Sequence, residues 1–230
     1  MTTNNPTLRT STSVRNVRPH ATLLLPFLCS LILTACTSTE PRYFTLTPVA
    51  KDPMQSTLIS DPHMEIEVSP MIVPSYLTGS RVVVRDPTKP AKLRFLEYSR
   101  WSAPLPDELR HALSWQLRFD LGAGDTYYSG SSAKAVRYRV TTELCEPESA
   151  SGQDVQTVVD WEVRRIPDES VITGRTLVRW PSDQSDDATL AGYRLVIRTL
   201  ADDISNAVKK MEQVSHRGVS ARHIGSAHAG

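Results

Sequence analysis

The sequence predicts an α+β fold, in which a mostly antiparallel sheet packs with two main helices in a single domain. Three observations support this class. Four short β-rich segments precede any helical pattern, three longer segments alternate apolar and polar residues, and two segments place apolar residues at helical spacing. Strands and helices therefore come in separate runs, whereas an α/β protein would alternate them. The apolar share of 40% is enough for one substantial core.

The N-terminal segment has the composition of a secretory leader. Residues 1–20 are polar, contain three arginines and no acid, and lead into the apolar run of residues 21–33. That run has thirteen residues and contains Pro26. It is shorter than the roughly 20 apolar residues that a membrane-spanning helix needs. We therefore expect residues 1–35 to be a signal peptide and not a permanent transmembrane anchor.

The apolar run ends in a motif that resembles the lipobox of bacterial lipoprotein precursors, Leu33-Thr34-Ala35-Cys36. An aliphatic residue and two small residues precede the cysteine, whose thiol is the nucleophile that receives a diacylglyceryl group. We therefore expect Cys36 to become the first residue of the mature chain and to carry diacylglyceryl and N-acyl lipid. The alternative, a cysteine buried in a helical core, leaves the arginine-containing, acid-free leader unexplained.

A short tether, residues 36–41, joins this cysteine to the predicted domain of residues 42–212. The five residues between Cys36 and Arg42 span at most about 15–20 Å when extended, so the domain must lie close to its membrane. Two or more acyl chains make such an anchor stable, whereas a single chain gives marginal binding.

Four short segments are expected to form strands before the first helix. The second alternates apolar residues with two glutamates, which is the pattern of a half-buried strand. Asp-Pro and Lys-Pro pairs mark a turn between the third and the fourth. In chain order the segments are residues 42–47, 64–68, 81–85 and 93–98.

We expect the first helix to begin near Pro106, because proline suits the first turn of a helix. Asp107 and Glu108 follow it and complement the positive end of the helix dipole. Gly122 and Gly124 are expected to end the helix. The positions that recur at helical spacing and form a core face are Leu109, Ala112, Leu113, Gln116, Leu117 and Leu121.

Three longer strands are expected after this helix, and together they predict an antiparallel meander. Each alternates apolar and polar residues, as strands with one buried face do. The loops between them are rich in Glu, Ser, Gly, Pro and Asp, which favour turns. The three segments are residues 136–144, 155–163 and 171–180.

The last helix is expected from Asp186 to Lys210, with charges that again complement its dipole. An apolar stripe at three- and four-residue spacing follows it. One interpretation is that the stripe covers a face of the sheet, and the alternative is that it contacts another copy of the chain in a homo-oligomer. Residues 213–230 are small and polar and are expected to be disordered. The stripe consists of Leu190, Tyr193, Ile197, Leu200, Ile204, Ala207 and Met211.

Charge and cysteine content exclude several classes of protein. The leader contains three of the 26 basic residues and none of the 25 acidic ones. The mature chain is therefore slightly acidic, and no nucleic-acid partner is expected. Cys29 leaves with the leader and Cys36 would be acylated, so Cys145 has no intramolecular disulfide partner. A packed or idle thiol is the favoured interpretation of Cys145, and a reactive role is the alternative.

The sequence contains no recognisable catalytic, cofactor or metal motif. The turn at Gly122-Ala123-Gly124-Asp125 lacks the lysine and hydroxyl residue of a nucleotide-binding loop, and no serine stands in a Gly-x-Ser-x-Gly elbow. His216, His223 and His228 are irregularly spaced, whereas metal ligands need a fixed and convergent geometry. We therefore expect a non-enzyme with no catalytic residue, no cofactor and no metal.

Short motifs follow the lipobox in a recognisable order. They are Arg42-Tyr43-Phe44-Thr45-Leu46, Pro74-Ser75-Tyr76-Leu77 with Val82-Val83-Val84-Arg85, and Tyr98-Ser99-Arg100-Trp101-Ser102-Ala103-Pro104-Leu105. Together they resemble the ABC-type transport auxiliary lipoproteins, the paraquat-inducible protein C-like family. The resemblance covers residues 42 to 211, which is nearly the whole predicted domain.

The resemblance implies an outer-membrane lipoprotein that faces the periplasm of a Gram-negative bacterium. It would work with an MCE-domain (mammalian cell entry) substrate-binding protein and its ABC permease system, which move lipids between the inner and outer membranes. Thr37 after the lipidated cysteine, in place of aspartate, fits the outer-membrane sorting rule of enteric bacteria. Such a protein acts by protein–protein docking and not by chemistry.

Arg100 and Trp101 are the candidate partner-binding residues. Both residue types are enriched at the energetic centres of protein interfaces, because they combine large contact area with directional hydrogen bonds. The favoured alternative for Trp101 is that it fills the end of the core at a strand-to-helix junction, while the role of Arg100 stays open. Two other functions also stay open: a structural or assembly lipoprotein of an outer-membrane machine, and a carrier of a small apolar ligand.

Overall fold

The computed structural model describes residues 39–48, 64–86, 89, 92–125, 136–145, 147–150, 154–181 and 185–226. The expected signal peptide and Cys36 lie outside the described residues. A compact unit begins at Pro41 and contains every element named below. In chain order these are β1 (Arg42–Phe44), β2 (Glu65–Val68), the 3-10 helix η2 (Ser75–Leu77), β3 (Arg81–Arg85), β4 (Leu93–Trp101), α2 (Leu105–Leu121), β5 (Gly124–Asp125), β6 (Tyr138–Leu144), β7 (Glu148–Ala150), β8 (Asp154–Arg165), β9 (Val171–Pro181) and α3 (Asp186–Ser226).

The strands described form two mixed sheets. One sheet has three strands in the order β1-β4-β3, and the other has six, in which β8 lies between β9 on one side and β6 and β7 on the other. The predicted α+β class and single folded domain are confirmed. Parallel pairs, which the sequence patterns did not indicate, join β1 to β4 and join β2 to both β5 and β6. The chain between β2 and β6 includes α2, and such a crossover lets β6 run in the same direction as β2.

The predicted antiparallel meander is confirmed in β6, β8 and β9. Strand β8 pairs antiparallel with β6 and with β9. The alternation expected from the sequence is plain in β6, where every second side chain, beginning with Tyr138 and ending with Leu144, is buried. The short strands β5 and β7 are additions to the predicted set.

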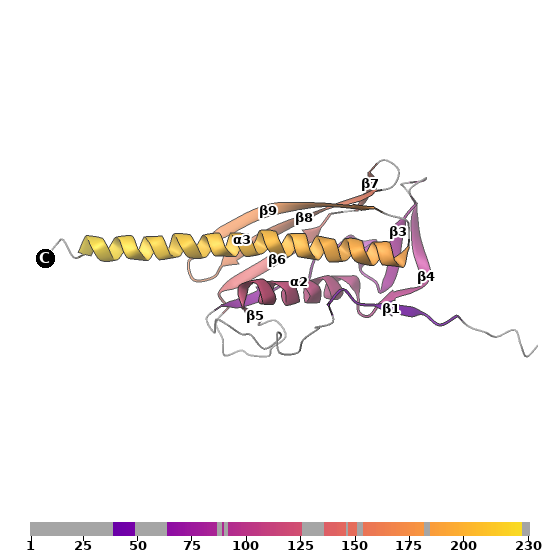
Figure 1. The fold of residues 1–230 in the computed structure, drawn as a ribbon, viewed down its shortest axis with the longest axis horizontal. Coiled ribbons are helices and arrows are strands. Elements are labelled where there is room, and N and C mark those ends of the chain that lie inside the picture. The colour runs from indigo at the N-terminus through magenta and orange to yellow at the C-terminus, as the bar shows by residue number, and fades with distance from the viewer. Residues whose placement is uncertain are drawn as a thin grey trace, which may run out of the picture. The chain divides into compact units, whose positions relative to one another are not determined.

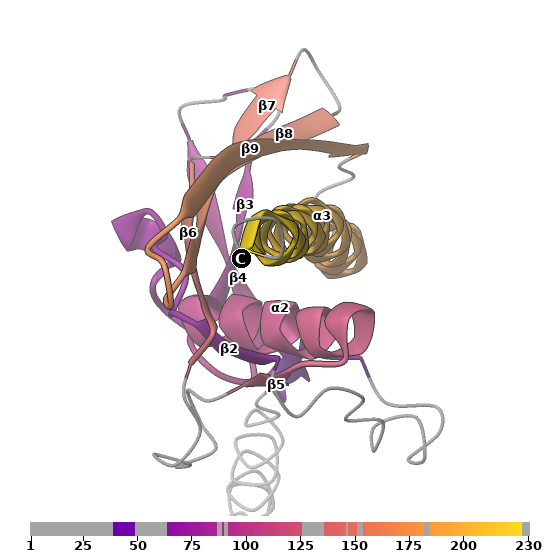
Figure 2. The same ribbon diagram turned by 90° about the vertical axis from the view of Figure 1, so that its left-hand side faces the viewer.

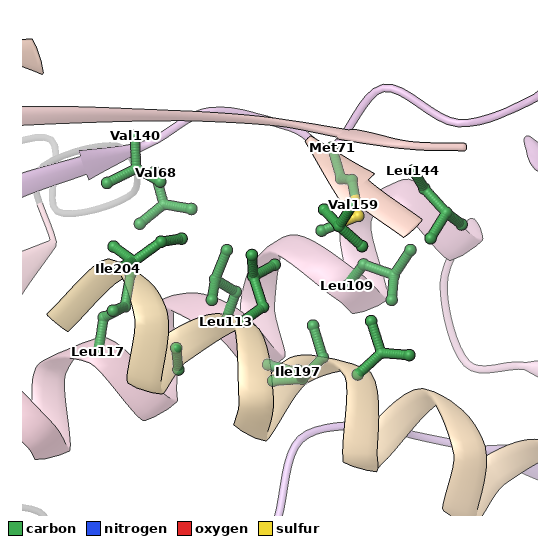
Figure 3. Close-up of a cluster of buried hydrophobic side chains, with 14 of the residues drawn as sticks. Val68, Met71, Leu109, Leu113, Leu117, Val140, Leu144, Val159, Ile197 and Ile204 are labelled. Carbon is green, nitrogen blue, oxygen red and sulfur yellow. The ribbon is translucent and has the colours of Figure 1, made fainter. Parts of the chain in front are cut away.

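Both helices pack on the inner side of the six-stranded sheet, which curves around them (Figure 2). Helix α2 ends at Gly122, whose φ of 61° is the left-handed conformation that glycine adopts at helix ends. Apolar side chains from α2, α3 and the sheet meet in one core (Figure 3). Its members include Val68, Met71, Leu109, Leu113, Leu117, Val140, Leu144, Val159, Ile197 and Ile204.

Helix α3 is longer than the sequence patterns indicate (Figure 1). It does not end at Lys210 but continues to Ser226, so the expected disorder is wrong for residues 213–226. No proline interrupts this stretch, and extending a formed helix is easier than nucleating one. The apolar stripe is buried within the chain or packs against the core, so it covers the sheet and α2. A contact between copies of the chain stays a prediction and would need another surface. No helix in the described part of the chain is long and apolar enough to cross a membrane.

Candidate binding surface on the three-stranded sheet

The register of the three-stranded sheet decides which side chains share a face. Tyr43 of β1 and Arg81 of β3 both lie opposite Arg100 of β4. Phe44 lies opposite Trp101 in the same way. Because successive side chains of a strand point to opposite faces, Arg100 and Trp101 belong to different faces, although they are adjacent in the sequence.

The inner face belongs to the core, and Trp101 is part of it. The Trp101 side chain is only 2% exposed. Its ring meets the Tyr193 ring of α3 edge to face, with centroids 5.6 Å apart and an interplanar angle of 87°. The backbone N–H of Trp101 donates to the Ser80 carbonyl at 2.6 Å. Trp101 therefore lies at the strand-to-helix junction as packing, where it has almost no surface to offer a partner.

A buried carboxylate holds the start of the domain to α2. Glu108 is 3% exposed and accepts hydrogen bonds from the Thr45 hydroxyl and the Leu46 backbone N–H, both at 2.9 Å. The Ser102 hydroxyl donates to the other oxygen of the same carboxylate. The segment after β1 and the turn after β4 are therefore fixed to the first turn of α2.

A second polar cluster ties β1 to the start of α3. The Arg42 guanidinium forms an ion pair with Asp186, the first residue of α3. The Ser99 hydroxyl donates to the same Asp186 oxygen at 2.7 Å. The first residues of the domain, directly after the expected tether, are thus joined to both helices.

The outer face of the three-stranded sheet presents arginines and exposed aromatic rings. Tyr43 is 67% exposed, and Phe95 and Tyr98 are each 42% exposed. The Arg81 guanidinium lies 4.8 Å from the centroid of the Phe95 ring. Arg100 lies between Tyr43 and Arg81 by register, and its guanidinium donates to the Leu96 and Ser99 carbonyls, each at 3.0 Å. We call Tyr43, Arg81, Phe95, Tyr98 and Arg100 the arginine–aromatic surface.

The charge of this sheet is one-sided. Its three strands contain five arginines and a single acid, Glu97. Glu97 is exposed, as are Phe95 and Tyr98, and the pairing of β3 with β4 shifts its register between Arg81 and Val83, so alternation does not separate Glu97 from the arginine–aromatic surface. Among the described residues, neither Arg81 nor Arg100 forms an ion pair with an acid. Their positive charge is therefore not neutralised by direct contact with an acid of the described residues.

The chemistry of this surface is that of recognition. Guanidinium groups donate directional hydrogen bonds to phosphate and carboxylate oxygens, and exposed aromatic rings add apolar area with a polar tip in tyrosine. In the part of the chain that the structure describes, no three His, Cys, Asp or Glu residues are grouped so as to hold a metal ion.

The Cys145 thiol lacks the features of an activated nucleophile. Burial, together with the neighbouring Asp160 carboxylate, raises the pKa of Cys145, whereas reactive cysteines have a lowered pKa. Asp160 itself is bound by Arg175 through two hydrogen bonds at 2.6 and 2.8 Å. The interpretation of Cys145 as an idle thiol fits this environment.

A partly open cavity lies between the two sheets beside the start of α3. Its volume of about 450 Å³ includes space open to solvent, whereas sites for small ligands enclose most of the ligand surface. The cavity therefore provides little support for a carrier of an apolar ligand. It is lined by Tyr76, Leu77, Val83, Val84, Leu93, Pro147, Val155, Trp180, Thr189 and Tyr193.

Sequence reasoning found one member of the arginine–aromatic surface, Arg100, and missed the other four. Tyr43 and Tyr98 stand in motifs that were already singled out, and alternation along β4 could have grouped Tyr98 with Arg100. No pattern in the sequence indicates that Arg81 and Tyr43 flank Arg100, because that follows from strand order alone.

Comparison with known proteins gives one family and several solved folds. Residues 44–205 match the family described as ABC-type transport auxiliary lipoprotein component. A solved uncharacterized protein aligns with a TM-score of 0.56 and 14% identity, covering 74% of this chain and 99% of its own. A solved protein from Xanthomonas campestris aligns with a TM-score of 0.52 and 13% identity, covering 78% and 98%. At these identities the likeness concerns the fold alone. No curated protein matches the chain in a sequence comparison.

Proposed function

This chain belongs to the ABC-type transport auxiliary lipoprotein component family, and from that membership we propose that it serves an MCE-type ABC system that moves lipids between the inner and outer membranes. The observation that carries the proposal is the extent of the family match. It includes nearly all of both sheets, the whole of α2 and about the first half of α3. The whole domain, and not one motif, is therefore that of a transport auxiliary lipoprotein.

The proposed mode of action is docking between proteins. An auxiliary component can act by holding partners in place, which requires binding surfaces and no catalytic group. The described residues provide an exposed surface of arginine and aromatic side chains, together with a thiol whose pKa is raised and not lowered. Both observations support binding over chemistry.

The proposed location is the periplasmic face of the outer membrane. Lipid on Cys36 would anchor the chain, and the tether of five residues would hold β1 within about 20 Å of the anchored cysteine. Thr37, in place of aspartate, supports outer-membrane sorting. The proposed partners are the MCE-domain substrate-binding protein and its ABC permease system.

The direct test is capture of the tagged full-length protein from crosslinked envelopes. We expect it to bring down an MCE-domain protein and the permease components. The Cys36→Ala variant should lose incorporation of labelled palmitate and should leave the outer-membrane fraction.

Two results would count against the proposal. Capture of outer-membrane channel components without any MCE-domain protein would favour an assembly lipoprotein instead. Palmitate incorporation into Cys36→Ala would show that the lipid is attached elsewhere.

A further inference from the structure

We propose that the arginine–aromatic surface lies against the anionic phospholipid headgroups of the membrane that holds the lipid anchor. This inference rests on the proposed lipidation of Cys36, and it goes beyond docking to a transporter. It gives the surface a specific ligand, the phosphate groups of a bilayer. It also assigns a function to Tyr43, Arg81, Phe95 and Tyr98, which family membership leaves without one.

The first argument is distance along the chain. Tyr43 follows the lipidated cysteine by seven positions, and six intervening residues span at most about 20 Å when extended. Headgroup and interfacial regions extend several ångströms beyond the hydrocarbon core on each side of a bilayer. A residue so close to the anchor therefore cannot leave the neighbourhood of the headgroups, and the register of β1 and β4 keeps Arg100 beside it.

The second argument is chemistry. Tyrosine is enriched at membrane interfaces, because its ring enters the headgroup layer while its hydroxyl stays hydrated. Basic side chains near an anionic leaflet are attracted to it within a Debye length. The arginine–aromatic surface combines both, with Tyr43 and Tyr98 exposed beside Arg81 and Arg100.

The third argument is that electrostatic attraction of this protein to an anionic membrane must come from a local group of charges. The mature chain would be slightly acidic, so its total charge would not draw it to an anionic membrane. On the outer face of the other sheet, Arg139 pairs with Glu67 and Arg175 with Asp160, while Arg179 donates to the side-chain oxygen of Gln156. Arg81 and Arg100 form no such pair among the described residues, so the three-stranded sheet presents its positive charge to a ligand.

The proposal also orients the long helix. The Arg42–Asp186 ion pair places the first residue of α3 next to β1, at the membrane side of the domain. The 41 residues of α3 extend about 60 Å from there. The C-terminal part of α3, which continues past the six-stranded sheet (Figure 1), is then directed to partners and not to the anchor.

The test measures binding of unlipidated protein to vesicles. The chain beginning at residue 37 lacks the predicted lipidated cysteine and retains the compact unit from Pro41 with its whole core, so we expect it to fold without the leader. We expect it to bind phosphatidylcholine vesicles that contain phosphatidylglycerol, and to bind pure phosphatidylcholine vesicles far less. Each arginine at the surface should contribute about five-fold to the partition coefficient, so the double variant Arg81→Gln, Arg100→Gln should bind about 25-fold more weakly.

A matched control separates this surface from net charge. The double variant Arg139→Gln, Arg175→Gln removes the same two charges from exposed strands of the six-stranded sheet. It should retain nearly all of the phosphatidylglycerol-dependent binding. Thermal unfolding of both double variants shows whether each is folded at the assay temperature. A further double variant, Tyr43→Ser with Tyr98→Ser, leaves the charge unchanged and should also weaken vesicle binding.

Several outcomes would overturn the inference. If the two arginine double variants lost vesicle binding equally, total charge and not this surface would explain the binding. Unchanged vesicle binding after loss of Arg81 and Arg100 would exclude the surface directly. If that variant lost capture of the MCE-domain protein and kept vesicle binding, the surface would be a protein interface, as predicted for Arg100 from the sequence. If the wild-type chain captured no MCE-domain protein but bound the vesicles, the proposed transport function would be contradicted. The inference about the membrane surface would then still hold.

Discussion

The strands of the three-stranded sheet contain five arginines and one acid, whereas the strands of the six-stranded sheet contain five arginines and eight acids. On the larger sheet Arg139 binds Glu67, Arg164 binds Glu162 and Arg175 binds Asp160, while Arg179 donates to the Gln156 side chain. On the smaller sheet Arg42 pairs with Asp186 of α3, whereas Arg81 lies over an aromatic ring and Arg100 bonds to backbone carbonyls of its own strand.

On the six-stranded sheet most exposed arginines are paired within the chain, whereas the surface of the three-stranded sheet can accept a ligand. Exposed ion pairs contribute little to stability, since water competes with each partner. On the six-stranded sheet, the main effect of these ion pairs is that few guanidinium groups can donate hydrogen bonds to an external anion. The smaller sheet keeps its aromatic rings exposed, and no described acid pairs with its Arg81 or Arg100. We therefore expect substitutions on the two sheets to affect different properties, and four experiments test this.

The largest expected effect separates the two faces of β4. Trp101→Ala should lower the free energy of unfolding by about 3–5 kcal/mol, because it leaves a large cavity beside Tyr193 in the core. Tyr98→Ala, on the outer face of the same strand, should change it by only about 0.5 kcal/mol. Urea denaturation measures both. Comparable losses would mean that the outer face is structural and not a binding surface.

The next effect concerns the attachment of β1. Glu108→Ala should cost about 3 kcal/mol, because three buried or partly buried donors lose their acceptor. Asp107→Ala, in the same helical turn, removes only a favourable charge at the helix start and should cost about 0.5 kcal/mol. Amide hydrogen exchange should show the Leu46 N–H losing protection in Glu108→Ala alone. Protection that persisted would mean that Glu108 does not hold this segment.

A smaller effect comes from the ion pair that joins the six-stranded sheet to α3. Arg137 donates to Glu212 at 2.9 and 2.7 Å, and the Tyr138 hydroxyl donates to the same carboxylate. Burial acts to raise the pKa of Glu212, but the hydrogen bonds from Tyr138 and Arg137 outweigh it and hold that pKa below its usual value of 4.5. Burial, and then Glu212, raises the pKa of Tyr138 to about 12.

The pH dependence of this cluster follows from the direction in which the pKa of Glu212 is shifted. A lowered pKa means that Glu212 stabilises the fold fully above pH 4.5 and loses that contribution as the pH falls through its folded-state pKa. Glu212→Gln should therefore cost about 1–2 kcal/mol at neutral pH, with the difference from wild type vanishing in acid. Glu67→Gln, which breaks the exposed pair with Arg139, should cost less. Denaturation at several pH values tests this, and a constant difference between the variants would be incompatible with it.

The smallest expected effect is on the alkylation rate of the Cys145 thiol and not on stability. Because burial and the Asp160 carboxylate raise the pKa of the thiol above 9.0, iodoacetamide should alkylate the chain beginning at residue 37 slowly at neutral pH. Asp160→Asn removes the negative neighbour and should speed the reaction severalfold, whereas Asp168→Asn in the turn between β8 and β9 should not. An unchanged rate in Asp160→Asn would show that burial alone suppresses the thiol.

Much of the fold could be predicted because its signals are local. The alternation in β6, the apolar spacing of α2 and the glycine after it each depend on neighbouring residues, and all three match the structure. The end of α3 could not be predicted in this way, since the polar residues after Lys210 are compatible with either a helix or a disordered tail. The parallel pairing of β2 with β6 depends on a crossover through α2, which periodicity does not indicate.

The candidate surface shows the same division. The sequence places Arg100 next to Trp101 and suggests a shared role, but strand alternation separates them into a binding face and a core face. Glu108 looks like an ordinary first-turn acid in the sequence, where it complements the helix dipole. Its buried bonds to Thr45 and Leu46 join residues more than 60 positions apart, and only the fold makes that contact.

By itself, the sequence determined the order and type of the main strands and helices, the family resemblance, and a motif resembling a lipobox, from which lipidation of Cys36 and a short tether are predicted. These follow from patterns within a few residues, where side-chain spacing and composition act directly. The tertiary structure decided the mixed pairing of both sheets and the buried position of Trp101. It also decided the meeting of Tyr43, Arg81 and Arg100 on one exposed face. The physical reason is that strand order and register bring together segments from β1, β3 and β4, and no local pattern encodes which of them become neighbours.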